Sequence, residues 1–173
     1  MNHTHPAKAL KFCPFCGSNQ FVWDNKKAHH CMNCLHRLYT NEAGAVVALI
    51  ENNKKEILFT LRKFDPAKGK LDLPGGFIDL GETAERAVVR EVKEELNIDV
   101  EAINFFGTFP NTYTFCDFTY FTIDMVFRCK VNDFSPIKAD DDVDSYRFIN
   151  PKNVSINEIG LDSIKNIIRL LKS

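Results

Sequence analysis

The chain has 173 residues, enough for one domain of ordinary size and a small attachment but too few for two full-sized domains. Hydrophobic residues make up 45% and charged residues 26%, so the chain can bury a core and is not a disordered segment. Its 22 lysines and arginines nearly balance 23 aspartates and glutamates. This balance argues against a protein whose main affinity comes from a basic nucleic-acid surface, and it favours small-molecule chemistry.

The first residues lack the apolar stretch of a signal peptide, and no apolar run approaches the length that crosses a bilayer. We therefore expect a soluble, cytoplasmic protein with no membrane partner. Six cysteines can indicate a disulfide scaffold in an exported chain. Without an export signal, four cysteines in close pairs more often bind metal.

Two Cys-x-x-Cys pairs, separated by 14 residues, indicate a zinc site formed by Cys13, Cys16, Cys31 and Cys34. Zinc is held tetrahedrally by four thiolates when two tight turns each supply a pair. Gly17 suits a position that needs a positive φ, and short strands are expected at 21–23 and 37–39. The sequence predicts a zinc ribbon over residues 8–41. Its zinc is structural, because four thiolates leave no open position for a water.

Histidines surround this motif, but the four cysteines already complete a zinc site. We interpret His29, His30 and His36 as solvated turn residues, and we place His3 and His5 in a mobile terminus. Cys129 falls on the apolar side of an alternating run over 121–131, which indicates a buried core thiol.

From residue 42 onward the pattern predicts one larger domain that extends to residue 173. Strands are expected at 45–50 and 56–61, with a turn between them, and then at about 100–109, 119–131 and 143–150. Apolar residues at helical spacing predict two helices, at about 83–96 and 161–171. Strands with a helix on either side indicate an α/β/α sandwich built on a mixed sheet.

The most informative segment is a glycine-containing loop, 73–82, followed by the helix that carries three glutamates. At 100° per residue, Glu91, Glu94 and Glu95 share one stripe of that helix. The stripe borders apolar Val88 and Val92, so a solvated charged face explains it poorly. The carboxylates repel one another, and a divalent cation reverses that effect. Hard oxygen ligands favour magnesium or manganese.

Small side chains allow the helix to approach the loop closely. Ala84 and Ala87 lie on the glutamate side of the helix, where the backbone carbonyls of Gly75 and Gly76 can complete the coordination. Arg90 precedes Glu94 by four residues and can order the stripe through an ion pair.

These residues resemble the Nudix hydrolase box: Gly, five residues, Glu, seven residues, Arg-Glu, an aliphatic residue, any residue, Glu-Glu, any residue, Gly and an aliphatic residue. The matching positions are Gly76, Glu82, Arg90, Glu91, Val92, Glu94, Glu95 and Ile98. Asn97 replaces the last glycine, and asparagine also tolerates a positive φ at a helix end. With its flanking strands the resemblance covers about residues 42–173. The preceding ribbon is similar to that of the NADH pyrophosphatase branch.

The resemblance implies an enzyme that hydrolyses the diphosphate bond of a nucleoside diphosphate linked to another moiety, such as ADP-ribose, NAD(H) or a related dinucleotide. It implies a catalytic magnesium or manganese ion held mainly by Glu91 and Glu95. Glu94 and the Gly76 carbonyl assist, Arg90 orients the ligands, and Glu82 supports the site. The general base stays open between Glu94, Glu95 and the later run Asp140, Asp141, Asp142 and Asp144, most of which is expected to be a solvated loop.

The substrate is less well defined than the reaction. The NADH branch carries a Ser-Gln-Pro motif after its box, whereas this chain has Phe109–Thr114 there. We expect Pro110 and Tyr113, with neighbouring aromatic residues, to form a wall on which an adenine stacks. Packing in the core or in an interface explains each of these side chains equally well.

A runner-up interpretation is a Nudix module that binds a nucleotide or an RNA end without cleaving it, with the ribbon as the nucleic-acid contact. The intact glutamates argue against lost catalysis, and the balanced charge makes nucleic acid an unlikely partner. Aromatic residues between Phe105 and Phe121 exceed what a single sheet hides, and the resembling zinc-ribbon proteins are dimers. We therefore expect a homodimer to which the ribbon and residues 105–120 contribute.

Overall fold

The computed structural model describes residues 2–173. The chain divides into two compact units. The first comprises the described residues up to Ala43 together with Thr112–Phe121, and the second comprises Gly44–Asn111 and Thr122–Ser173. Among the described residues, no helix combines the length and the apolar character that spanning a membrane requires.

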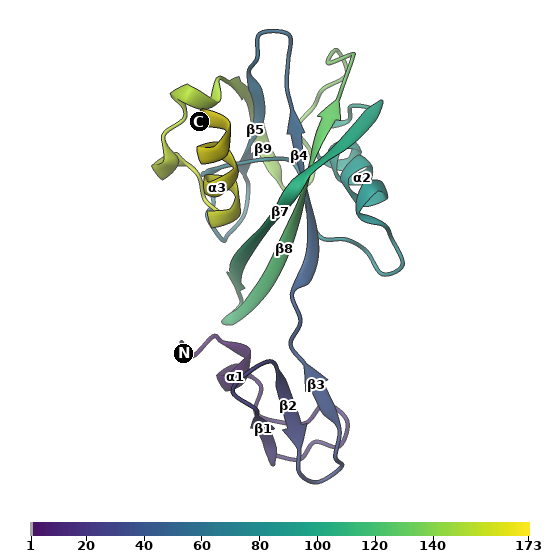
Figure 1. Cartoon of the computed structure of the whole chain (residues 1–173), viewed down its shortest axis with the longest axis vertical. Coiled ribbons are helices and arrows are strands. Elements are labelled where there is room, and N and C mark those ends of the chain that lie inside the picture. The colour runs from purple at the N-terminus through teal and green to yellow at the C-terminus, as the bar shows by residue number, and fades with distance from the viewer. Residues whose placement is uncertain (1) are drawn as a thin grey trace. The chain divides into compact units, whose positions relative to one another are not determined.

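The first unit is built on a small antiparallel sheet, visible in the lower part of Figure 1. Its elements are α1 (Pro6–Ala9), β1 (Phe21–Trp23), β2 (Ala28–Cys31) and β3 (Arg37–Tyr39), with β2 in the centre. Each Cys-x-x-Cys pair forms a tight turn that ends on a residue of positive φ. These residues are Gly17, with a φ of 72°, and Leu35, with a φ of 62°.

The histidines of this unit are less solvated than we expected from the sequence. His29 lies in the central strand β2, is 0% exposed, and stacks on Phe21 with the ring centroids 4.7 Å apart. The interpretation of His29 as a solvated turn residue is therefore wrong. His5 is also held in place, since its side chain accepts a hydrogen bond from the Ala7 N–H and its ring contacts Trp23 and Phe121.

The remaining strands form two three-stranded arrangements, which belong to the second unit except for the hairpin tip Thr112–Phe121. One has the order β4, β8, β7, and the other has the order β6, β5, β9. The strands are β4 (Ala43–Ile50), β5 (Ile57–Arg62), β6 (Leu71–Asp72), β7 (Ala102–Phe115), β8 (Phe118–Lys130) and β9 (Val143–Ile149). Strand β5 pairs antiparallel with both of its neighbours, and an isolated parallel bridge joins Leu71 to Ile159.

Two α-helices cover opposite faces of these strands, as Figure 1 shows. They are α2 (Ala84–Leu96) and α3 (Asp162–Lys172), and two 3₁₀ turns, η1 (Pro151–Asn153) and η2 (Ile156–Glu158), precede α3. A hydrophobic core lies on each face of the strands, one under α2 and one under α3. Residues of β4 alternate between them: Val46, Ala48 and Ile50 pack with α2, whereas Val47 and Leu49 pack with α3. The α/β/α sandwich on a mixed sheet that we predicted is confirmed.

The largest difference from the sequence prediction is the length of β7, which continues to Phe115 instead of ending near residue 109. Pro110 lies inside this strand, although proline lacks the N–H that a central strand needs. Strand β7 is an edge strand, where a proline is tolerated. A two-residue turn then leads into β8, and both turn residues, Cys116 and Asp117, have a positive φ of 47° and 58°.

The core under α3 gives a direct test of this packing. Ile167 is fully buried, so we expect Ile167→Ala to lower the free energy of unfolding by about 2–5 kcal/mol, because it leaves a cavity between the helix and the sheet. Leu170 lies on the same helix and is 55% exposed, so Leu170→Ala serves as the control and should change stability by less than about 0.5 kcal/mol. Urea unfolding of both variants measures the difference. Equal effects would contradict the orientation of α3.

Candidate active site

The ends of α2 are fixed by local interactions. The Thr83 hydroxyl accepts a hydrogen bond from the Arg86 N–H and caps the first turn. At the other end Asn97 adopts a left-handed conformation with a φ of 55°, as expected for a residue in the place of glycine. The buried side of the helix includes Val88 and Val92 next to the predicted ligand Glu95.

The loop before α2 packs closely against both strand β4 and the helix. The Val46 N–H donates to the Gly76 carbonyl and the Ala48 N–H donates to the Pro74 carbonyl, at 2.9 and 2.8 Å. A Cβ atom on Gly75 would lie 2.0 Å from the Val46 carbonyl oxygen, and one on Gly76 would lie 2.6 Å from a Glu91 carboxylate oxygen. Position 75 therefore requires glycine, because the clash there is with backbone, whereas a side chain at position 76 would displace the Glu91 carboxylate.

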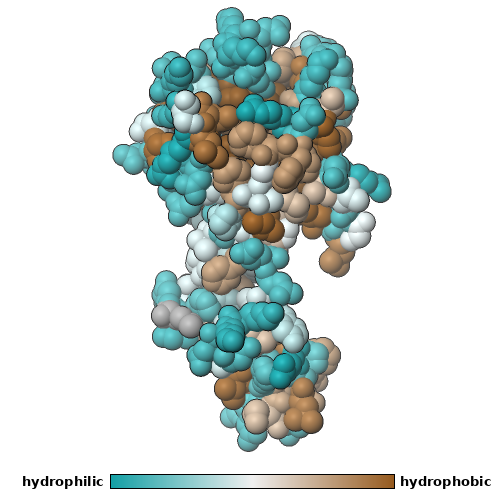
Figure 2. All heavy atoms as spheres, viewed as in Figure 1, coloured by the Kyte–Doolittle hydropathy of each residue, from teal (hydrophilic) through white to brown (hydrophobic). Residues whose placement is uncertain are grey.

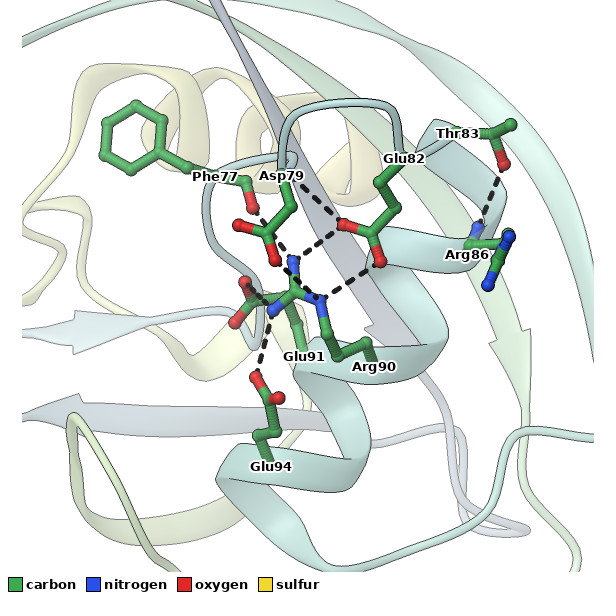
Figure 3. A network of polar contacts seen from close by, with 8 residues as sticks. All are labelled: Phe77, Asp79, Glu82, Thr83, Arg86, Arg90, Glu91 and Glu94. Atoms are coloured by element: carbon green, nitrogen blue, oxygen red, sulfur yellow. Dashed lines mark hydrogen bonds and ion pairs between the residues drawn. The ribbon is translucent and has the colours of Figure 1, made fainter.

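Arg90 joins this loop to the helix, as Figure 3 shows. Its guanidinium donates to Glu91 at 2.8 Å and to Glu94 at 2.9 Å. The same group donates twice to Glu82, at 3.1 and 2.9 Å, and once to the Phe77 carbonyl at 3.1 Å. The hydrogen bonds between Arg90 and Glu82 lower the pKa of Glu82 and raise the pKa of Arg90.

Glu91 and Glu95 lie deeper than the other glutamates of the stripe. Glu95 is only 7% exposed, and one of its oxygens accepts a hydrogen bond from the Gly75 N–H at 3.1 Å. Burial raises the pKa of Glu95 well above its usual value, and the charge of Glu91 adds to that effect. Burial also raises the pKa of Glu91, although Arg90 opposes the shift. Two desolvated carboxylates of this kind fit a bound divalent cation, which would stabilise their charged forms.

The structure thus brings together the site residues predicted in the loop and helix: Gly76, Glu82, Arg90, Glu91, Glu94 and Glu95. Glu94 differs from the other two ligands, because its side chain is 49% exposed. The Gly76 carbonyl already accepts one hydrogen bond, from β4, which leaves one lone pair for a ligand.

Sequence reasoning missed one buried acid close to these residues. Asp72 is 6% exposed, forms an ion pair with Arg62 at 2.7 Å, and contributes to the raised pKa of Glu95. A lone acid between Leu71 and Leu73 was the available signal, since a charged residue inside an apolar strand is rarely buried without a partner.

The acidic run after β8 also lies beside α2. The Asp140 N–H donates to the Glu95 carbonyl at 2.9 Å, and the charges of Asp141 and Asp142 contribute to the raised pKa of Glu91 and Glu95, respectively. Asp140, Asp141, Asp142 and Asp144 are all exposed. The solvated loop expected from the sequence therefore lies close to the candidate site.

The two residues of the predicted substrate wall fall in different compact units. Tyr113 belongs to the first compact unit, where its ring lies near those of Phe115 and Tyr120, with the centroids 6.3 and 6.0 Å apart. Pro110 is exposed on β7 within the second unit. The assignment of Pro110 and Tyr113 to substrate binding stays a prediction.

A separate candidate metal centre lies in the first unit. The sulfur atoms of Cys13, Cys16, Cys31 and Cys34 all lie within 4.8 Å of one another, with pairs as close as 3.5 and 3.7 Å. Tetrahedral zinc with bonds of about 2.3 Å separates its sulfur ligands by roughly 3.8 Å. A hydrogen bond from the Ser18 N–H, with help from Asn33, lowers the pKa of Cys16 to about 6. The donor set and its spacing fit zinc.

Comparison with known proteins identifies the larger unit. The NUDIX domain family matches residues 41–170. The chain belongs to the NUDIX family. An NAD-capped RNA hydrolase, NudC, of Vibrio atlanticus is 32% identical over 110 residues, which cover 64% of this chain and 40% of that protein. An ADP-ribose pyrophosphatase of Methanocaldococcus jannaschii is 45% identical over 76 residues, 44% of either chain. The matches span less than half the length of both relatives.

Solved structures show the same NUDIX fold. A NUDIX hydrolase from Nitrosomonas europaea superposes with a TM-score of 0.69 over 94% of this chain and 91% of that one, at 23% identity. The bifunctional NMN adenylyltransferase/ADP ribose pyrophosphatase from Francisella tularensis gives a TM-score of 0.59 over 79% of this chain and 42% of that one, at 26% identity. The family resemblance predicted from the sequence is confirmed.

The tight fit of the loop leads to a prediction about metal affinity in this NUDIX protein. In Gly76→Ala the new methyl group overlaps the Glu91 carboxylate, so we expect manganese affinity, measured by electron paramagnetic resonance, to fall at least about tenfold. The control is Gly107→Ala, because a Cβ atom there meets its nearest neighbour at an ordinary 3.5 Å. Unchanged manganese binding in Gly76→Ala would contradict a ligand role for Glu91 in the position that the structure gives it.

Proposed function

We propose that the protein is a magnesium- or manganese-dependent NUDIX pyrophosphohydrolase that acts in the cytoplasm. Its substrate is a nucleoside diphosphate linked to another moiety, in the class of ADP-ribose, NAD(H) or a related dinucleotide. The observation that carries the proposal is the pair of buried carboxylates, Glu91 and Glu95, held against the Gly75–Gly76 loop. The similarity to a hydrolase of NAD-capped RNA and to an ADP-ribose pyrophosphatase supports the substrate class.

In this proposal the residues have distinct roles. Glu91 and Glu95 hold the cation, assisted by Glu94 and the Gly76 carbonyl. A cation held there would withdraw charge from the diphosphate and help to position the attacking water. Arg90 keeps Glu91 and Glu94 in place through the two hydrogen bonds it donates to them. Glu82 in turn fixes the guanidinium by accepting two hydrogen bonds.

A carboxylate must also accept the proton of the attacking water. Glu94 and Glu95 are candidates from the helix, and the loop of Asp140, Asp141 and Asp142 supplies a second group. The hydrogen bond from the Asp140 N–H to the Glu95 carbonyl anchors that loop beside the helix. Both groups remain candidates for the general base.

The first prediction concerns Glu95. We expect Glu95→Gln to lower the magnesium-dependent release of phosphate products from ADP-ribose by at least about a hundredfold, because the neutral amide binds the cation poorly. Thermal stability should hold or rise slightly, since the substitution removes a buried charge. The control is Glu85→Gln, at an exposed position in the first turn of the same helix. Near-normal turnover of Glu95→Gln at saturating magnesium would refute the proposed site.

The second prediction concerns zinc. We propose that one structural zinc ion per chain is held by Cys13, Cys16, Cys31 and Cys34. In Cys13→Ser we expect the zinc content to fall and residues 8–41 to become sensitive to protease, while residues 42–173 stay folded. Elemental analysis and limited proteolysis measure these effects. Protein purified without chelator that contains no zinc would contradict the assignment.

The third prediction concerns assembly. We propose a homodimer, because several aromatic side chains between Phe105 and Tyr120 face solvent: Phe105 is 62% exposed, Phe115 48% and Tyr120 40%. Light scattering at micromolar concentration should return about twice the mass of one chain, which is 19.8 kDa. Phe105→Ser should shift the equilibrium toward the monomer, whereas Leu170→Ser, at another exposed apolar position, should not. A wild-type mass of one chain would exclude the dimer.

A further inference from the structure

The near-zero charge of the whole chain conceals two regions of opposite charge. Residues 1–41 contain five basic residues and one acidic residue, whereas the rest of the chain contains 17 basic and 22 acidic residues. The basic residues of the first region are Lys8, Lys11, Lys26, Lys27 and Arg37. The argument against a nucleic-acid surface from net charge therefore applies to the chain as a whole and not to its ribbon.

The structure leaves these basic side chains without acidic partners. Among the described residues, none of the five forms an ion pair. The single acid of the region, Asp24, closes its own turn, because its carboxylate accepts hydrogen bonds from the N–H groups of Lys26, Lys27 and Ala28. The first unit also contains two exposed acids beyond this region, Glu42 and, at the hairpin tip, Asp117, whose carboxylate lies 3.9 Å from His3. The positive charge of the ribbon is thus available to an external anion.

Large apolar side chains are exposed where the two cysteine turns meet. Phe12 is 63% exposed, Phe15 69% and Leu35 82%. The Phe15 ring lies on that of His36 with the centroids 3.4 Å apart, and the sulfur atoms of Cys13 and Cys34 are 3.7 Å apart, so the two turns are adjacent. Figure 2 shows apolar side chains at the surface of the small unit, in the lower part of the view. The knuckle surface comprises Lys11, Phe12, Phe15, Leu35, His36 and Arg37.

The backbone at Leu35 gives a second reason to assign a contact role to this surface. Gly17 and Leu35 occupy the same place in the two turns, one residue after the second cysteine, and their N–H groups bond to the carbonyls of Cys13 and Cys31. Both residues have a positive φ, which glycine adopts freely and leucine adopts only with strain. The Leu35 side chain is 82% exposed, so packing within the unit does not offset that strain.

We propose that the knuckle surface binds single-stranded RNA. Lys11 and Arg37 can neutralise backbone phosphates, while Phe12 and Phe15 offer ring faces on which unpaired bases stack. The same surface of a second copy is a poorer occupant, since two basic ribbons would repel each other. The choice of RNA rests on the proposed function, because a nucleoside diphosphate can stand at the 5′ end of an RNA chain. The binding does not require hydrolysis.

Fluorescence anisotropy with a labelled single-stranded RNA of mixed sequence tests the electrostatic part, in buffer that contains neither divalent cations nor chelator. We expect the affinity to fall as salt rises, with a slope of about −0.7 per phosphate contacted. The double variant Lys11→Glu/Arg37→Glu should bind more than about tenfold more weakly. The matched control is Lys54→Glu/Lys152→Glu, which makes the same change in net charge at exposed positions of the second unit. It should bind like the wild type.

A second pair of variants tests the aromatic part. Phe15→Ala should weaken RNA binding about tenfold, since it removes one stacking platform. Phe64→Ala is the matched control, because Phe64 is 53% exposed and lies under the ammonium group of Lys63 at 5.3 Å, but belongs to the second unit. The same sequence as DNA and as a duplex RNA should bind more weakly than the single-stranded RNA.

Each variant must keep the zinc content and the circular dichroism spectrum of the wild type, so that lost binding reflects the surface and not the fold. The proposal is wrong if the wild type does not bind the RNA, if the control variants lose as much affinity as the knuckle variants, or if DNA binds more tightly. It is also wrong if Phe15→Ala changes only the mass in sedimentation experiments, because the surface would then join two copies of the chain. If Glu95→Gln loses turnover but binds RNA normally, the RNA-binding proposal still holds.

Discussion

The candidate site depends on the burial of two carboxylates, Glu91 and Glu95. The space for them exists because the neighbouring loop has glycine at positions 75 and 76. Strand β4 holds that loop through the backbone hydrogen bond from Val46 to Gly76, and α2 brings the carboxylates to it. A methyl group on either glycine would overlap the strand or a carboxylate. The positions of strand, loop and helix are therefore mutually determined, and the site forms only where all three meet.

Desolvation matters more in this site than repulsion between the carboxylates. Like charges at helical spacing destabilise an exposed helix by only a few tenths of a kcal/mol per pair. Removing a carboxylate from water has an effective penalty of several kcal/mol. Burial is the main cause of the raised pKa values of both Glu91 and Glu95, as expected if desolvation outweighs repulsion. The proposed cation would therefore act mainly by replacing lost hydration, because Arg90 also binds Glu82 and Glu94.

The sequence predicts most of this arrangement because the residues concerned are close together in the chain. Spacing along α2 places the glutamates on one stripe, and the paired cysteines define the ribbon. What could not be predicted depends on tertiary pairing. Strand β7 continues past Pro110 only because it is an edge strand, and His29 is buried only because β2 is the central strand of its sheet. Asp72 raises the pKa of Glu95 from β6, a strand too short to show a periodic pattern.

The net charge of the whole chain is a poor guide to its partners, because it averages over two units that differ in charge. A formal charge of −1 argues against nucleic-acid binding only if the charges are mixed, and here the basic residues of the ribbon are segregated from the acidic larger unit. At physiological ionic strength, screening limits the reach of a surface charge to about 8 Å. An anion at the knuckle surface therefore responds mainly to Lys11 and Arg37 and little to the balance of the whole chain. The local charge, and not the total, decides which partners this surface can bind.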